Sequence, residues 1–163
     1  MKKSIDNNIE LQKFKDEFES NLKIYEGKPG GGKSFSAKSE INQLSLMEDI
    51  NIYVIDSHKE YKKLDRENVN INNDIENIFE ILDDIYEKSG VLTVNQKTIV
   101  YIENFELYCR GREKQIKFLD YAEKLKHHGI SFVLIVQDLE FMDRLIRNMY
   151  LLYCGEHYEF NRD

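Results

Sequence analysis

The sequence predicts an α/β fold in which a mainly parallel sheet is covered by helices on both faces. Stretches typical of strands alternate along the chain with stretches of helical periodicity, which is the order that strand–helix–strand units produce. The predicted strands are apolar at nearly every position, a pattern typical of strands that are buried on both faces. Ligands of such sheets bind at the carboxyl ends of the strands, so the residues that follow each strand are the candidates for function.

Each element is assigned from its apolar pattern and from the residues that bound it. Strands are expected at 21–26, 51–56, 98–102, 130–136 and 149–154, with an edge strand at 68–72 and a hairpin partner of the last strand at 158–160. Helices are expected at 33–48, 58–64, 74–88, about 112–128 and 139–148. The helix at 74–88 has the clearest period, with Asp74 as its N-cap and Gly90 as its stop.

The length and composition indicate one acidic globular domain. Within the 163 residues, 1–20 have the pattern of a separate amphipathic helix, and 21–163 are expected to form a single core domain. The net charge of −7 argues against non-specific binding of nucleic acid, because affinity for the phosphate backbone depends on Lys and Arg. It leaves open DNA contact through a local patch or a ring of subunits. Two cysteines are too few for a disulfide framework, and the N-terminus is charged throughout, so a cytoplasmic location is expected.

A glycine-rich loop lies between the first predicted strand and the helix that follows it. Residues 27–34, GKPGGGKS, match the pattern G-x-x-x-x-G-K-[ST], in which backbone N–H groups surround phosphate oxygens. A flexible linker is the alternative, but it predicts neither the strand before the loop nor the helix after it. Lys33 is expected to reach the β- and γ-phosphates, and Ser34 to place its hydroxyl on Mg²⁺. The residues predicted to bind ATP are Gly27, Lys28, Pro29, Gly30, Gly31, Gly32, Lys33, Ser34 and Phe35.

A second acidic element is expected at the end of the strand at 98–102. Glu103 follows this strand directly, where an acid that holds Mg²⁺ is required, and it is assigned both a metal and a catalytic role. Asn104 stands where a catalytic Glu is common; an amide cannot accept a proton as a general base, but it can orient a water. The alternative for Glu103 is a simple cap at the end of a strand.

Three further polar residues follow predicted strands or lie close to their ends. Gln137 comes directly after the strand at 130–136, where an amide can sense the γ-phosphate and hold the attacking water; a hydrogen bond to a turn is an equal alternative. Asp56 ends the strand at 51–56 and Glu60 follows it, and either can position water across the site if Glu103 binds the metal. The alternative for Asp56 is that it caps the next helix.

Beyond these motifs, the chain resembles the conjugation and type IV secretion ATPases of the HerA/FtsK superfamily. Asp56, Glu60 and Tyr61 match that family's Asp-Pro-x-x-Glu-Tyr pattern, with a serine in place of the proline. Gln137 and Asp138 match its Thr-Gln-Asp pattern, with a valine in place of the threonine. The segments that carry the resemblance are GKPGGGKSFSAKSEI at 27–41, YVIDSHKEYKKL at 53–64 and IVQDLEFMDRLIRNM at 135–149.

The resemblance implies a RecA-like P-loop ATPase core that uses Mg²⁺ and ATP, assembles as a hexameric ring and drives DNA or protein transfer at the inner face of a membrane complex. Three departures limit it. Family members are several times longer, Asn104 replaces the family's second acid, and the arginine that such rings supply in trans has no clear counterpart. Four arginines can substitute for it, although a solvated surface charge is the simpler interpretation of each. They are Arg110, Arg112, Arg144 and Arg147.

Three hypotheses for the function remain at this point. The first is a minimal motor ATPase. The second is a nucleotide-binding regulatory subunit that has lost hydrolysis, which the Glu103–Asn104 pair favours. The third, a small P-loop kinase, ranks last, because it needs a lid with clustered arginines and the segment 104–115 holds only two.

Overall fold

The computed structural model describes residues 20–61, 66–89 and 96–160. The helix predicted for 1–20 and the stop predicted at Gly90 therefore lie outside the described residues, apart from Ser20. The strands in the described ranges are β1 (Leu22–Glu26), β2 (Ile50–Ile55), β3 (Val69–Asn72), β4 (Lys97–Ile102), β5 (Ile130–Val136) and β6 (Glu156–Glu159). They form one sheet of order β3-β2-β4-β5-β1-β6, in which every pair is parallel. The predicted parallel α/β fold is confirmed.

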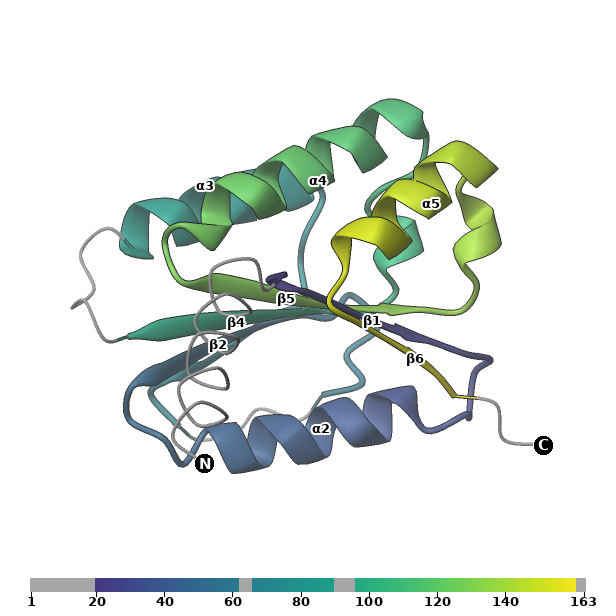
Figure 1. The fold of residues 1–163 in the computed structure, drawn as a ribbon. Coiled ribbons are helices and arrows are strands. Elements are labelled where there is room, and N and C mark those ends of the chain that lie inside the picture. The colour runs from purple at the N-terminus through teal and green to yellow at the C-terminus, as the bar shows by residue number, and fades with distance from the viewer. Residues whose placement is uncertain (1–19, 62–65, 90–95, 161–163) are drawn as a thin grey trace, which may run out of the picture.

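Helices cover both faces of this sheet (Figure 1). One face carries α2 (Lys33–Leu44), and the other carries α3 (Ile78–Ser89), α4 (Arg112–Lys126) and α5 (Arg144–Tyr153). Successive strand residues point to opposite faces of the sheet and so belong to two separate cores. Ile24 and Val100 pack toward α3–α5, and Tyr25 and Tyr101 pack toward α2. None of the helices in the described part of the chain is long and apolar enough to cross a bilayer.

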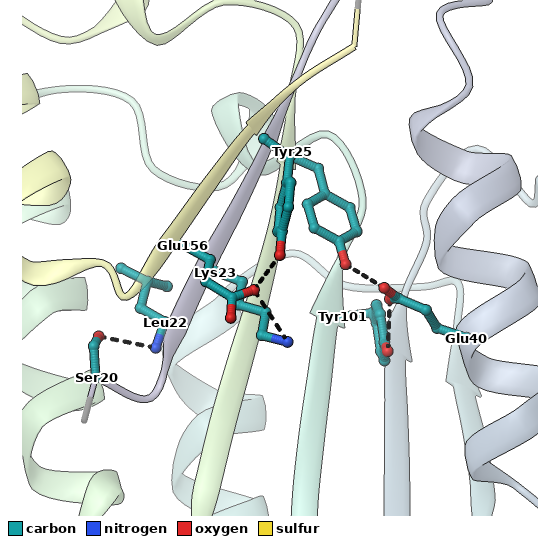
Figure 2. Close-up of polar contacts among 8 residues, drawn as sticks. Ser20, Leu22, Lys23, Tyr25, Glu40, Tyr101 and Glu156 are labelled. Atoms are coloured by element: carbon teal, nitrogen blue, oxygen red, sulfur yellow. Dashed lines mark hydrogen bonds and ion pairs between the residues drawn. The ribbon is translucent and has the colours of Figure 1, made fainter. Parts of the chain in front are cut away.

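Polar contacts fix α2 against its face of the sheet (Figure 2). The carboxylate of Glu40 accepts hydrogen bonds from the hydroxyls of Tyr25, on β1, and Tyr101, on β4, the second at 3.2 Å. At the edge of the sheet, Lys23 on β1 forms an ion pair with Glu156 on β6, with 3.5 Å between Nζ and Oε2. The two hydrogen bonds to Glu40 hold the helix that begins at Lys33 in a fixed position over β1 and β4.

The C-terminal part of the fold corrects two predictions. The strand predicted at 149–154 lies mostly within α5, and the segment predicted as its hairpin partner contributes to β6, which pairs in parallel with β1. The run MYLLYC has apolar side chains on both the buried and the exposed side of the helix: Tyr150 is fully buried, whereas Leu152 is 87% exposed. An exposed apolar stripe thus gave this helix the composition of a buried strand.

Helix boundaries account for the remaining differences. The helix α3 begins at Ile78 rather than at 74, because the side chain of Asn77, not Asp74, accepts the N–H of Phe79, at 3.0 Å. The helix predicted at 139–148 is split into a 3₁₀ turn, η2 (Leu139–Phe141), and α5, and Asp138 and Asp143 cap the two separately. Residues 57–61 form no regular helix, unlike the start of the helix predicted at 58–64, and the rest of that predicted helix lies outside the described ranges.

Candidate nucleotide-binding site

The glycine-rich loop connects the end of β1 to the first turn of α2. Its backbone is fixed at the start by the N–H of Gly27, which donates to the carbonyl of Val136 on β5 at 3.1 Å. Gly30 and Gly32 have φ of 81° and 103°, which a residue with a side chain adopts only under strain. The chain therefore curls directly into a helix N-terminus, where N–H groups and the helix dipole favour an anion.

The C-terminal strand gives a second reason for glycine in this loop. Phe160, just after β6, donates its N–H to the carbonyl of Glu26 at 2.7 Å. A Cβ atom at Gly27 would lie 2.2 Å from the carbonyl oxygen of Phe160, and one at Gly31 would lie 2.6 Å from it. Sequence reasoning missed this contact, because it assigned residues 158–160 to a hairpin instead of to the edge next to β1.

Lys33 lies at the centre of the site and is only 7% exposed. Its ammonium donates to the carbonyl of Gly27, so the side chain is folded back along the loop. Burial lowers the pKa of Lys33, and the charges of nearby carboxylates, led by Glu103 and Glu106, oppose that shift. The cation is thus held among acids at the position where the motif places the phosphates.

Glu103 lies beside Ser34 and is 3% exposed. The Ser34 hydroxyl donates to one carboxylate oxygen of Glu103 at 2.9 Å, and the Tyr61 hydroxyl donates to the other at 2.7 Å. Burial raises the pKa of Glu103, while the hydrogen bonds from Tyr61 and Ser34 lower it. A hydroxyl and a carboxylate this close form a set of hard oxygen donors, and these residues fit Mg²⁺.

The two secondary acids also lie at this edge of the sheet. Asp56, directly after β2, is fully buried, and one of its oxygens accepts the N–H of Tyr61 at 2.8 Å. Its other oxygen has no hydrogen-bond partner among the described residues. Glu60 is exposed. The negative charges of Glu60 and Asp56 both act to raise the pKa of Glu103.

The remaining predicted residues lie around this centre. Gln137 is exposed and follows β5, the strand between β1 and β4. Asn104 is half-buried and adopts the left-handed conformation, with φ of 53° and ψ of 52°. Phe35 is 76% exposed on the first turn of α2. The structure therefore brings the loop, Glu103 and Gln137 to one edge, as the strand order requires.

One acid at the site was missed by sequence reasoning. Glu106 lies on a 3₁₀ turn, η1 (Phe105–Leu107), close enough to Lys33 for each charge to act on the other. Only its spacing could have drawn attention to it, because it follows the strand-end acid Glu103 by one turn. The sequence pattern predicts only an ordinary loop for this stretch.

A parallel sheet with this loop between its first strand and the following helix defines a P-loop nucleotide-binding domain. The chain belongs to the family of the central domain of helicase HerA, whose family model matches residues 26–129. No curated protein matches the chain. The family assignment confirms the resemblance to the HerA/FtsK superfamily. A role in conjugation or type IV secretion is a narrower assignment within that superfamily.

Solved structures share the fold at low sequence identity. The DNA-packaging ATPase B204 from Sulfolobus turreted icosahedral virus is 16% identical, with a TM-score of 0.64 over 87% of this chain and 76% of that one. The cytoplasmic domain of the Thermomonospora curvata type VII secretion ATPase EccC is 8% identical, with a TM-score of 0.64 over 88% of this chain but only 20% of that one. The cytoplasmic domain of EssC is 16% identical, with a TM-score of 0.55 over 87% of this chain and 31% of that one.

Proposed function

We propose that this domain binds ATP with Mg²⁺ at the loop from Gly27 to Phe35 and hydrolyses it. The observation that carries the proposal is the contact between Ser34 and Glu103, 2.9 Å apart, beside the buried ammonium of Lys33. Phosphoryl transfer depends mainly on positioning and on stabilising charge, and these groups supply both.

Each residue has a defined part in this proposal. When nucleotide binds, the ammonium of Lys33 leaves the Gly27 carbonyl and donates to the β- and γ-phosphates instead. There it neutralises charge on the transferred group. Ser34 and Glu103 hold Mg²⁺, which would neutralise charge on the phosphates when bound. Gln137, at the end of the strand between β1 and β4, orients the attacking water.

The experiment that tests the proposal measures binding and turnover together. A fluorescent ATP analogue is titrated onto the wild-type chain, and phosphate release is followed with ATP or GTP, in Mg²⁺ or in excess EDTA. We expect binding and slow turnover with ATP, and loss of turnover in EDTA. A folded chain that binds no nucleotide contradicts the proposal.

Asn104 favours a second candidate function, a nucleotide-binding regulatory subunit that does not hydrolyse ATP. Its side chain cannot act as a general base, and its left-handed backbone turns the chain away directly after Glu103. The same titration separates the two candidates: tight binding without phosphate release supports the regulatory subunit.

We further propose that the domain works as a homo-oligomeric ring, hexameric by family resemblance, within cytoplasmic DNA or protein transfer machinery of the conjugation and type IV secretion kind. The resemblance of the segments at 53–64 and 135–149 supports the machinery. An exposed apolar stripe on α5 supports the ring: Leu145, Met149 and Leu152 are 58%, 38% and 87% exposed, at positions that share one helix face.

Replacing Leu145 and Leu152 with serine tests this stripe. Both side chains are exposed, so we expect folding to be preserved and self-association in ATP and Mg²⁺ to weaken by at least about tenfold, since two apolar anchors are lost. Sedimentation velocity over a concentration series measures the effect. The pair Glu113→Ser and Asp120→Ser on α4 has the same spacing and serves as the control. Unchanged sedimentation of the leucine variant would show that α5 is not an interface.

Replacing Tyr61 with phenylalanine tests the support of Glu103. The ring stays buried, but Glu103 loses the 2.7 Å hydrogen bond that fixes one of its oxygens. Since such supporting contacts orient metal ligands, we expect the Mg²⁺ concentration for half-maximal turnover to rise about tenfold. Tyr108→Phe is the matched control, because that hydroxyl contacts Ser57 instead. An unchanged Mg²⁺ dependence would mean that Glu103 needs no such support.

A further inference from the structure

The chain after β4 is folded so that a second carboxylate is fixed beside the phosphate loop. Asn104 reverses the direction of the backbone in its left-handed conformation, and the N–H of Leu107 donates back to its carbonyl at 2.9 Å. Phe105 is fully buried and packs edge-on against Phe118, with 4.8 Å between ring centroids. Glu106 lies between this anchor and Leu107, on a turn that packs against β5.

The carboxylate of Glu106 has an unusual environment. Its Oε2 atom is buried and has no hydrogen-bond partner among the described residues. Burial raises the pKa of Glu106, while the backbone N–H groups of Glu106 and Gln137 and the charges of Lys33 and Arg110 lower it. A buried oxygen without a donor is costly, so its retention beside Lys33 points to a use in the site.

The other acids at the site are less suited to accept a proton from a water. Both oxygens of Glu103 are engaged, by Ser34 and Tyr61. Asp56 also has an oxygen without a partner among the described residues, but it is not among the four carboxylates whose charges act most on Lys33, which are Glu103, Glu106, Glu60 and Glu26. Glu60 acts on Lys33 less than Glu106 does and is exposed. Glu106 alone among these acids combines a free oxygen with a position next to both Lys33 and Gln137.

We propose that Glu106 is the general base of the reaction, in place of the acid that Asn104 replaces. The proposal rests on the ATP hydrolysis proposed above. The water oxygen forms a bond to the γ-phosphorus, and the bond from that phosphorus to the β–γ bridging oxygen breaks, so ADP leaves with that oxygen and its electron pair. Glu106 takes one proton from the water and later returns it to solvent. Burial raises the pKa of this carboxyl, which is the direction that makes a carboxylate a stronger base.

Glu106→Gln tests the assignment, because the amide keeps the shape of the side chain but cannot take the proton. We expect turnover to fall at least about a hundredfold, with binding of a non-hydrolysable ATP analogue within about twofold of wild type. Glu140→Gln, at an exposed position on η2, is the control and should retain turnover within about twofold.

The possible outcomes separate this inference from the function on which it rests. Full turnover of Glu106→Gln, with turnover lost in Lys33→Ala, overturns the base and leaves ATP hydrolysis intact. A loss of analogue binding as large as the loss of turnover also overturns it, because Glu106 then serves to hold the nucleotide. Absence of turnover in the wild type overturns both. A selective loss of turnover in Glu106→Gln is the supporting result.

Discussion

Replacing Lys33 with alanine is expected to abolish ATP turnover and to weaken ATP binding at least about a hundredfold, since charge-assisted contacts to two phosphates are lost. The side chain is 7% exposed, and its ammonium is the group that the loop directs toward the phosphates. Without it, Glu103 and Glu106 would face the triphosphate with no cation between them, so like charges would oppose binding as well as catalysis.

Lys33→Met separates the charge from the packing, because the methionine side chain fills nearly the same space. We expect this variant to bind and turn over ATP as poorly as Lys33→Ala, in the same fluorescence titration and phosphate-release assay. Lys114→Ala, an exposed lysine of α4, is the control and should behave as wild type. Wild-type turnover in Lys33→Met would contradict the role given to the ammonium.

Replacing Glu103 with glutamine is expected to lower turnover at least about a hundredfold, because the charge that attracts the metal is lost. The amide keeps the length of the side chain and can still pair with the hydroxyls of Ser34 and Tyr61, so the fold should be preserved. Metal-free ATP should bind at least as well as to wild type, since one negative charge facing the phosphates is gone.

Turnover and ATP binding of Glu103→Gln are measured over a series of Mg²⁺ concentrations. We expect the enhancement of binding by Mg²⁺ to shrink together with turnover. Glu113→Gln, an exposed residue of the first turn of α4, controls for the change in net charge. If Glu103→Gln retains the Mg²⁺ dependence of the wild type, Glu103 caps the strand end and another acid holds the metal.

Most of the sheet could be predicted because buried parallel strands have a distinctive composition. The apolar runs at 51–56, 98–102 and 130–136 correspond to β2, β4 and β5 within one or two residues. The prediction failed in the second half of α5, because Met149, Leu151 and Leu152 are apolar and exposed, and composition does not reveal which side of a helix is covered. It failed also for β6, whose partner, β1, is more than a hundred residues earlier in the chain.

The site shows the same division between local and tertiary information. The contact between Ser34 and Glu103 could be expected, because a motif fixes one residue and the carboxyl ends of parallel strands meet at one edge. The place of Glu106 could not, because it depends on the left-handed turn at Asn104 and on the burial of Phe105. The packing of Phe160 on the loop depends in turn on β6, which was assigned to the wrong partner.

A single-turnover experiment tests the central claim, that this P-loop domain hydrolyses ATP, most directly. Wild-type chain in excess over ATP labelled at the γ-phosphate is quenched at intervals, with Mg²⁺ or with EDTA, so that a trace contaminant accounts for little of the product. Conversion of the bound ATP to ADP and phosphate in Mg²⁺, and not in EDTA or by Lys33→Ala, is the predicted result. ATP that stays bound and intact would contradict hydrolysis and identify the domain as a nucleotide-binding subunit.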